Sequence, residues 1–231
     1  MVAVTASLVD MVDADGVHDA PRGKRGVFIA LEGGEGCGKS TQALQLAQWL
    51  RDCGLRVVLT REPGGTPVAE AIRTVVLSAD DDGLDGRVEA LLFAAARGDH
   101  VKRVIRPALD RGDWVITDRY IDSSIAYQGY ARGLDRAYVA ELSAWVTDGL
   151  RPDLTIVLDL DPTTSHQRLA EKDRLESEAI DFHHAVREGF LDLAAQDPQT
   201  YLVVDASLSV DTISAAIQER VAGLLVLIGV E

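Results

Sequence analysis

The fold of this chain is decided by one stretch, Gly33-Gly34-Glu35-Gly36-Cys37-Gly38-Lys39-Ser40-Thr41, which fits the phosphate-binding pattern G-x-x-x-x-G-K-[ST]. The stretch follows the apolar run Val27-Phe28-Ile29-Ala30-Leu31, which is typical of a buried strand. It precedes residues 42–51, where leucine and alanine recur at helical spacing. Strand, glycine-rich loop and helix, in this order, form the context that the pattern needs in order to bind phosphate.

Each part of this loop has a physical role in binding a nucleoside triphosphate. The glycines let backbone N–H groups curl around phosphate oxygens, and the N-terminus of the following helix adds partial positive charge. Lys39 supplies a charge for the β- and γ-phosphates, and Ser40 supplies a hydroxyl for Mg²⁺. We therefore expect residues 33–41 to hold the triphosphate.

The composition bounds the class of protein. The chain has 231 residues, 47% of them hydrophobic and 26% charged, which fits one globular α/β domain. The net charge of −14 argues against sequence-independent binding to nucleic acid, because such binding needs a basic face. The two cysteines, Cys37 and Cys53, give no disulfide framework and no metal-ligand spacing, so we expect a cytoplasmic protein. No run is long and apolar enough to span a membrane.

The first 25 residues differ from the rest. They contain four aspartates and lack both the basic region and the continuous apolar run of a signal peptide. We expect a disordered extension over residues 1–25 and a single domain over residues 26–231.

Strand-like and helical runs alternate along the chain. Strands are expected at Val27–Glu32, Val57–Thr60, Trp114–Thr117, Leu154–Leu160 and Tyr201–Val204. Helices are expected at about 39–53, 67–78, 86–110, 135–149, 162–171, 179–196 and 209–228. Near-continuous apolar strands are typical of parallel strands that are covered on both faces. The predicted fold class is therefore α/β, with a five-stranded parallel sheet between two layers of helices.

Polar motifs follow the strands at the edge where parallel sheets bind ligands. The second strand ends in Thr60-Arg61-Glu62-Pro63-Gly64-Gly65-Thr66, and the third ends in Asp118-Arg119-Tyr120. The run Ser123-Ser124-Ile125-Ala126-Tyr127-Gln128-Gly129 comes soon after the third strand. Phe93 and Arg97 are four residues apart and so share one face of a helix. The guanine signature Asn-Lys-x-Asp is missing from the sequence, as is an apolar run that ends in Asp-Glu.

In order, these blocks resemble those of bacterial thymidylate kinases over about residues 26–228. The run Arg151-Pro152-Asp153-Leu154 and the run Asp173-Arg174-Leu175-Glu176 continue the resemblance. The resemblance implies a P-loop NTPase fold, a three-layer sandwich with a short lid. It also implies transfer of the γ-phosphoryl group of ATP to dTMP, which gives dTDP and ADP, with Mg²⁺ as the cofactor. Homodimers are usual in the family, and Leu91, Leu92, Val101 and Val104 would fit either a dimer contact or the core.

The resemblance also assigns catalytic and metal-binding roles. The acceptor is a phosphate oxygen that is already ionised at neutral pH, so no general base is needed. Lys39 would hold the ATP phosphates, and Arg119 would contact the dTMP phosphate and offset charge on the transferring group. Ser40 and Asp118 would bind Mg²⁺, although Asp118 could also be an ion-pair partner of a nearby arginine.

Further residues would bind the substrate. Phe93 would stack on thymine, although spacing alone would also allow a place in the core. Glu62 would orient Arg119 or a metal-bound water. The other implied contacts are Arg97, Ser124 and Gln128 at the base edge, Tyr127 near the sugar, Glu35 at the 3′-hydroxyl and Arg73 at the phosphate.

The lid is expected at about residues 166–178. Family members with glycine where this chain has Gly36 take a catalytic cation from the lid. The candidates here are Arg168, Lys172 and Arg174, of which we select Arg174. Arg174 could equally be a structural partner of Asp173 or Glu176. A closed lid would exclude the water that otherwise hydrolyses ATP.

Two other functions stay open at this point. A kinase with a hydroxyl acceptor would need a carboxylate base, and Glu35, Glu62 or Asp118 could serve. A nucleotide-binding switch would hydrolyse ATP slowly and would leave the constellation of Phe93 and Arg97 without a purpose.

Overall fold

The computed structural model of the protein describes residues 25–78, 84–166 and 174–228, and the structural statements below concern these ranges. The extension expected to be disordered lies outside them, except for Arg25. Residues 167–173, which include the lid candidates Arg168 and Lys172, also lie outside.

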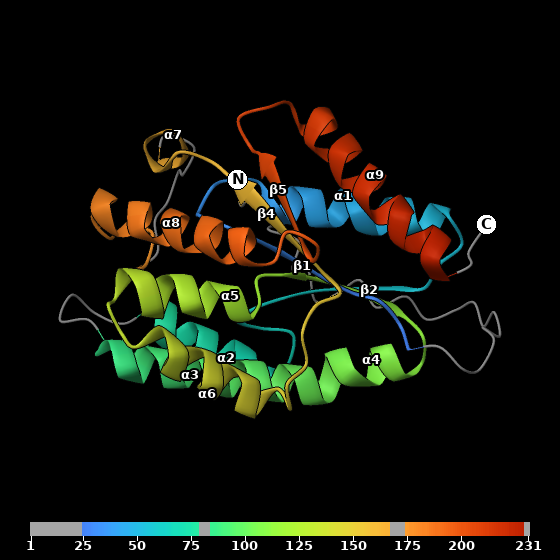
Figure 1. Cartoon of the computed structure of the whole chain (residues 1–231). Helices are drawn as coiled ribbons and strands as arrows, with labels where there is room; N and C mark the ends of the chain where they lie inside the picture. Colours follow the sequence, from blue (N-terminus) through green and yellow to red (C-terminus); the bar gives the residue numbers. More distant parts are fainter. Residues whose placement is uncertain (1–24, 79–83, 167–173, 229–231) are drawn as a thin grey trace, which may run out of the picture.

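Five strands form one parallel sheet in the order β2-β3-β1-β4-β5, which confirms the predicted sheet (Figure 1). The strands are β1 (Phe28–Gly33), β2 (Val57–Arg61), β3 (Trp114–Asp118), β4 (Leu154–Asp159) and β5 (Tyr201–Asp205). The central strand β1 has β3 on one side and β4 on the other. Ligands of such sheets bind beyond the carboxyl ends of the strands where the order switches, so the ends of β1 and β3 mark the site.

Both faces of the central strand are buried. Side chains alternate across a strand, so Ile29 and Leu31 pack into the cluster formed with α1 and α9. Phe28 and Ala30 pack into a second cluster on the opposite face. This double burial explains why β1 has apolar residues at successive positions.

Helices cover the two faces of the sheet unequally (Figure 1). One face packs against α1 (Lys39–Asp52) and α9 (Val210–Ile228). The other face packs against α8 (Ile180–Gln196) and two helical runs near residues 101–131. The remaining helices are α2 (Pro67–Leu77), α3 (Gly86–His100), α6 (Arg136–Val146) and α7 (Pro162–His166).

The long helix expected at 86–110 contains a change in winding. The helix α3 continues into the π-helical segment η2 (Val101–Ile105) and then α4 (Arg106–Asp110). Pro107 has no N–H to donate and its ring would clash with the carbonyl of residue 103, so regular α-helical bonding cannot continue there.

A further helical run follows β3 where the sequence predicted only a motif. It consists of α5 (Ile121–Ser124) and the π-helical segment η3 (Ile125–Ala131). This run packs against α8, so tertiary contact stabilises a segment whose serines and glycine disfavour a helix. It carries Ser123, Ser124, Tyr127 and Gln128 to the site.

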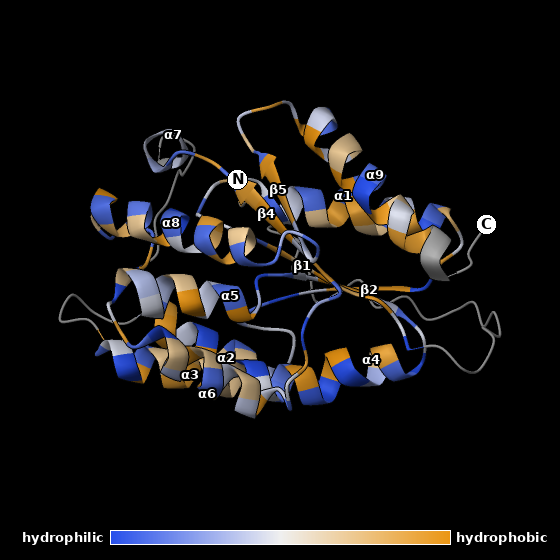
Figure 2. Ribbon diagram, viewed as in Figure 1, coloured by the Kyte–Doolittle hydropathy of each residue, from blue (hydrophilic) through white to orange (hydrophobic). Residues whose placement is uncertain are grey.

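Hydropathy follows this layering. Figure 2 shows strands coloured as hydrophobic, whereas the helices mix hydrophobic and hydrophilic residues along their length. Within the described ranges, the helices are all too short or too polar to span a bilayer.

Candidate active site

The phosphate-binding loop connects β1 to α1. Gly33 has a φ of 139°, and a Cβ at this position would lie 2.5 Å from the backbone oxygen of Leu158. Gly38 has a φ of 94° and precedes α1 directly, so both positions favour glycine for conformational reasons. The Nζ of Lys39 donates to the Gly34 oxygen at 2.6 Å, which holds the ammonium group over the loop.

A cavity of about 390 Å³ opens along this loop. Its loop residues are Glu35, Gly36, Gly38, Lys39, Ser40 and Thr41. Gly33, Gly34 and Cys37 are not among its lining residues, and Cys37 is buried with its Sγ donating to the Gly34 oxygen. This cavity, which we call the phosphate cavity, therefore lies where the sequence predicted the triphosphate.

Two oxygen ligands for a metal meet at the phosphate cavity. The Ser40 hydroxyl donates to Oδ2 of Asp118 at 2.5 Å. Mg²⁺ is commonly bound through one or two carboxylates together with substrate phosphates and waters, so this pair fits the ion. The described residues contain no cluster of three or more His, Cys, Asp or Glu side chains that could hold a metal by themselves.

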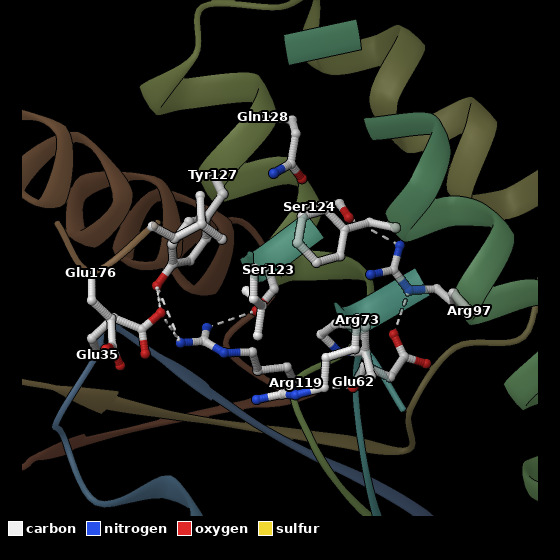
Figure 3. A pocket seen from close by; sticks show the side chains of 14 residues that line it. Glu35, Glu62, Arg73, Arg97, Arg119, Ser123, Ser124, Tyr127, Gln128 and Glu176 are labelled. Atoms are coloured by element: carbon white, nitrogen blue, oxygen red, sulfur yellow. Dashed lines mark hydrogen bonds and ion pairs between the residues drawn. The ribbon is translucent and has the colours of Figure 1, made fainter. Parts of the chain in front are cut away.

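A second cavity, of about 120 Å³, shares lining residues with the first, and Figure 3 shows the side chains that line it. We call it the base cavity. Its lining residues are Glu35, Glu62, Pro63, Arg73, Leu77, Phe93, Arg97, Arg119, Ser123, Ser124, Tyr127, Gln128, Leu175 and Glu176. All of the residues that the sequence analysis nominated for the substrate line this cavity.

The two cavities meet at shared side chains. These are Glu35, Glu62, Arg73, Arg119 and Glu176, each of which lines both cavities. A ligand in one cavity therefore lies next to a ligand in the other, as a direct transfer between two bound nucleotides requires.

Arg119 lies at this junction because it follows β3 directly. Its φ of 72° is a left-handed conformation, which costs a non-glycine residue free energy and is most often seen at functional sites. Its NH1 donates to the Gly33 oxygen at 3.1 Å and to the Ser123 hydroxyl at 3.0 Å. Its NH2 lies 2.7 Å from Oε1 of Glu35. Figure 3 shows the Arg119 guanidinium group between Glu35 and Ser123.

Glu35 is held as a carboxylate at the junction. Burial acts to raise its pKa, but the charges of Arg119 and Lys39 outweigh burial and lower the pKa to about 2. The Tyr127 hydroxyl also donates to Glu35 at 2.9 Å. The pKa of Tyr127 itself is raised, by burial first, so its hydroxyl keeps its proton.

Arg97 is buried, and its side chain is fixed by the protein. Its Nε donates to Glu62 at 2.7 Å, its NH1 to Ser124 and Ser143, and its NH2 to the Tyr120 oxygen. These bonds use four of the five N–H groups of a guanidinium. The fifth N–H, on NH2, has no hydrogen-bond partner among the described residues.

Glu62 has different partners from those predicted. Its Oε2 accepts from Arg97 and its Oε1 lies 3.0 Å from Nδ1 of His100. The predicted contact with Arg119 is not among the hydrogen bonds of the described residues, where Glu62 pairs with Arg97 and His100, and the predicted alternative of a metal-bound water stays a prediction. Glu62 instead orients Arg97.

The lid arginine also has a different position from the expected one. The Nε of Arg174 donates to the Val76 oxygen at 2.9 Å, and its NH2 lies 2.6 Å from Oε2 of Glu89. Arg174 is not among the residues that line either cavity. Its ion pair is with Glu89, whereas the alternatives weighed from sequence were Asp173 and Glu176.

Four residues that line the base cavity were quoted in motifs but not nominated, and these are Pro63, Ser123, Leu175 and Glu176. Ser123 accepts from Arg119, and Leu175 and Glu176 come from the C-terminal part of the expected lid. The motif Ser123-Ser124 and the motif Asp173-Arg174-Leu175-Glu176 contain three of these residues. In the second motif only the arginine has the positive charge expected of a catalytic lid residue.

A buried carboxylate, Glu32, accepts a hydrogen bond from Ser123. Glu32 is fully buried, and its Oε2 accepts from the Ser123 hydroxyl at 2.6 Å while its Oε1 accepts from the Tyr120 N–H at 2.8 Å. Burial, with a smaller contribution from the nearby Asp122 charge, raises the pKa of Glu32 to about 7. The last position before the glycine-rich loop gave no hint of this role.

Comparison with known proteins agrees with this geometry. The family model for thymidylate kinase matches residues 31–217. A thymidylate kinase of Leifsonia xyli subsp. xyli is 54% identical over 207 residues, which cover 88% of this chain and 98% of the relative. A thymidylate kinase of Cutibacterium acnes is 50% identical over 200 residues, covering 87% of this chain and 98% of the relative.

A solved structure shares the fold. The crystal structure of thymidylate kinase from Ehrlichia chaffeensis superposes with a TM-score of 0.71 at 34% identity and covers 85% of this chain and 99% of that chain. Since a family match over residues 31–217, relatives of about 50% identity and a common fold all agree with the two adjoining cavities, the chain belongs to the thymidylate kinase family.

Proposed function

We infer that the protein is an ATP-dependent nucleoside-monophosphate kinase, which transfers the γ-phosphoryl group of ATP to dTMP and gives dTDP and ADP. The observation that carries this inference is the junction at Arg119, where a P-loop cavity and a cavity suited to a base adjoin. ATP would lie along the loop and dTMP in the base cavity, with the two phosphate groups meeting at the shared side chains.

The reaction relies on positioning and charge. The dTMP phosphate is an ionised nucleophile, so Lys39 and Arg119 are needed for stabilisation of the transferring group and not for proton abstraction. We propose that Ser40 and Asp118 would bind Mg²⁺, which neutralises charge on the ATP phosphates when bound. Arg73 lines both cavities, which supports a contact with the dTMP phosphate.

We propose that the other end of the base cavity recognises thymine. Phe93 is half-buried and lines the cavity, which supports stacking on the base. Arg97 offers its remaining N–H to a base carbonyl, and Ser124 and Gln128 lie on the same wall. Tyr127 and Glu35 are hydrogen-bonded to each other beside Arg119, where the sugar would lie.

The contacts of Arg174 support a role in holding the C-terminal part of the expected lid against α2 and α3 rather than a contact with the transferring group. Its guanidinium lies with Glu89, away from both cavities. Lys39 and Arg119 therefore carry our catalytic assignment, and Glu176 is the residue of this segment that reaches the junction.

We also propose a homodimer and a cytoplasmic location. Helices α2, α3 and α6 carry exposed apolar residues, among them Val75, Leu91, Tyr138 and Trp145. Trp145 is 78% exposed, which favours a protein partner at this side of the molecule. Val101, considered for the same contact from sequence, is instead buried in the core.

The function is tested by ADP production from Mg-ATP with dTMP, dUMP, dCMP, dGMP and thymidine offered separately. We expect high activity with dTMP, lower activity with dUMP and none with thymidine. Activity with thymidine alone would identify a nucleoside kinase, and acceptor-independent hydrolysis would identify a switch.

A further inference from the structure

A buried carboxylate, Glu89, lies behind the base cavity and has no part in the proposed chemistry. Its side chain on α3 is fully buried. Its Oε1 accepts from Nε2 of Gln128 at 2.8 Å, and its Oε2 accepts from NH2 of Arg174 at 2.6 Å. Arg132 approaches both oxygens, at 3.4 and 3.3 Å. Glu89 therefore joins the wall of the base cavity to two arginines.

These partners determine how the Gln128 amide is turned. A carboxylate only accepts hydrogen bonds, and Arg132 and Arg174 both form ion pairs with Glu89. The NH₂ group of Gln128 must therefore face Glu89, because the opposite orientation would place the amide oxygen against the carboxylate. The charge of Glu89 thus fixes an orientation that an amide by itself leaves open.

The fixed amide presents its oxygen elsewhere. Oε1 of Gln128 is buried and makes no hydrogen bond within the described ranges, although the residue lines the base cavity. In Figure 3 the amide of Gln128 points toward the cavity between Tyr127 and Ser124. A buried acceptor without a donor is costly, so a ligand that supplies an N–H there gains binding free energy.

An N–H donor to Oε1 of Gln128 would distinguish between pyrimidine bases. Thymine and uracil carry an N–H at ring position 3 next to a carbonyl, whereas cytosine carries an unprotonated nitrogen next to an amino group. Arg97 on the same wall offers an N–H, which matches a carbonyl. One acceptor and one donor in this order fit a 4-oxopyrimidine and oppose cytosine.

We propose that Glu89 is a specificity-determining positioning residue, which holds the Gln128 amide so that its oxygen accepts from the N3–H of the substrate base. The proposal rests on the proposed function, since it concerns dTMP in the base cavity. Glu89 would not touch the substrate and would act through Gln128 alone.

The decisive variant is Glu89→Gln. Arg132 and Arg174 can only donate, so the new amide would keep its oxygen toward them and turn its NH₂ group to Gln128. Gln128 would then reverse and present its own NH₂ group to the base. We expect KM for dTMP to rise about 10- to 100-fold, as for loss of a buried hydrogen bond. The ratio of kcat/KM for dCMP to that for dTMP should rise too, while KM for ATP stays within about 2-fold, because the P-loop is untouched.

Two further variants separate orientation from simple damage. The double variant Glu89→Gln with Gln128→Glu restores an acceptor toward the base, because the new carboxylate accepts from the new amide and turns its second oxygen to N3–H. We expect it to regain most of the dTMP affinity. Glu178→Gln is the matched control, because Glu178 lies 2.6 Å from Arg132 and is not among the residues lining the base cavity. We expect the ratio of kcat/KM for dCMP to kcat/KM for dTMP in Glu178→Gln to equal that of the wild type.

Three results would overturn the proposal. These are an unchanged dTMP KM in Glu89→Gln, an equal loss in Glu178→Gln, and a folded double variant that fails to regain dTMP affinity. If Glu89→Gln does not fold, the double variant decides alone. The ADP-production assay of the wild-type protein with dTMP is therefore run first. A wild-type protein without dTMP activity would refute the proposed function and not the role of Glu89 alone.

Discussion

Individual side chains of this site serve both the fold and the ligand. Arg97 is the clearest case, since it is buried, pairs with Glu62 and Ser124, and also lines the base cavity. Glu62 in turn also contacts His100, so the charged group is part of the core. A substitution at such a residue changes binding and stability together, and the two effects need separate measurements.

Arg97→Ala should weaken dTMP binding and destabilise the protein. Loss of the hydrogen bond to the base would cost about 1.5–3 kcal/mol of binding free energy. Loss of the buried partner of Glu62 would lower the free energy of unfolding by about 3–5 kcal/mol. Steady-state kinetics with dTMP and with ATP, and urea unfolding, measure these effects.

Arg103→Ala is the matched control for Arg97→Ala. Arg103 forms an exposed ion pair with Asp99 one helical turn away, so its loss should change stability by less than about 1 kcal/mol. A dTMP KM equal to that of the wild type in Arg97→Ala would show that Arg97 does not bind the base.

Glu32→Gln should stabilise the protein at pH 8 and not at pH 4. The pKa of Glu32 is raised in the fold to about 7 from 4.5, so between these values the unfolded chain has lost a proton that the folded chain keeps. Stability of the wild type therefore falls as pH rises through this window, and the neutral variant escapes a penalty of about 3 kcal/mol. Urea unfolding of both proteins across this pH range gives the difference, and a difference independent of pH would contradict the assigned pKa.

At the scale of elements, the strands could be predicted from sequence and part of the helical layer could not. The strands β1 and β4 are short apolar runs buried on both faces, and turn residues bound them, a combination typical of parallel strands. The run formed by α5 and η3 was missed because its serines and Gly129 have low helix propensity, and packing against α8 supplies the stability.

The site shows the same division. The residues of the base cavity could be nominated from motifs, because motifs specify which side chains are present at the strand ends. The ion pairs between these residues could not be predicted, because each joins residues that are far apart in sequence. Glu62 follows β2 and pairs with Arg97 on α3, and Arg174 pairs with Glu89, also on α3. Short sequence motifs do not indicate contacts between residues that are far apart in sequence.

Gly189→Ala tests how closely α8 and η3 pack. A Cβ at position 189 would lie 2.9 Å from the Tyr130 ring and 3.1 Å from Cα of Ala126, so the helices would have to separate. We expect a loss of about 1–3 kcal/mol in the free energy of unfolding, and a higher KM for dTMP because Tyr127 lies on the displaced segment.

Gly223→Ala is the control for Gly189→Ala. It lies on α9 with no atom within 4 Å of the new Cβ, so the variant should gain about 0.5–1 kcal/mol from helix propensity. Equal stability changes in the two variants would mean that packing of α8 on η3 is loose.

At the scale of the whole molecule, the described surface has two distinct parts. The carboxyl ends of the strands hold the two cavities, whereas α2, α3 and α6 expose apolar side chains. Because Phe93 and Arg97 belong to α3, a partner that covers this helix would also support the wall of the base cavity.

Trp145→Lys should convert the proposed dimer to a monomer. A charge at the centre of an apolar contact would be left without a partner on association. Sedimentation velocity measures the change, and Leu208→Lys, at another exposed apolar position after β5, should leave the dimer intact. A monomeric wild-type protein would refute the proposed assembly.

The shared wall between the two cavities has an energetic consequence. Glu35, Arg119 and the other common side chains line both cavities, so under the proposed function a nucleotide in one cavity would alter the surroundings of a nucleotide in the other. The two affinities must then be coupled, and the coupling is reciprocal: the factor by which dTMP changes the dissociation constant of ATP equals the factor by which ATP changes that of dTMP. A compound that fills only the base cavity should consequently shift the ATP binding isotherm without competing for the P-loop.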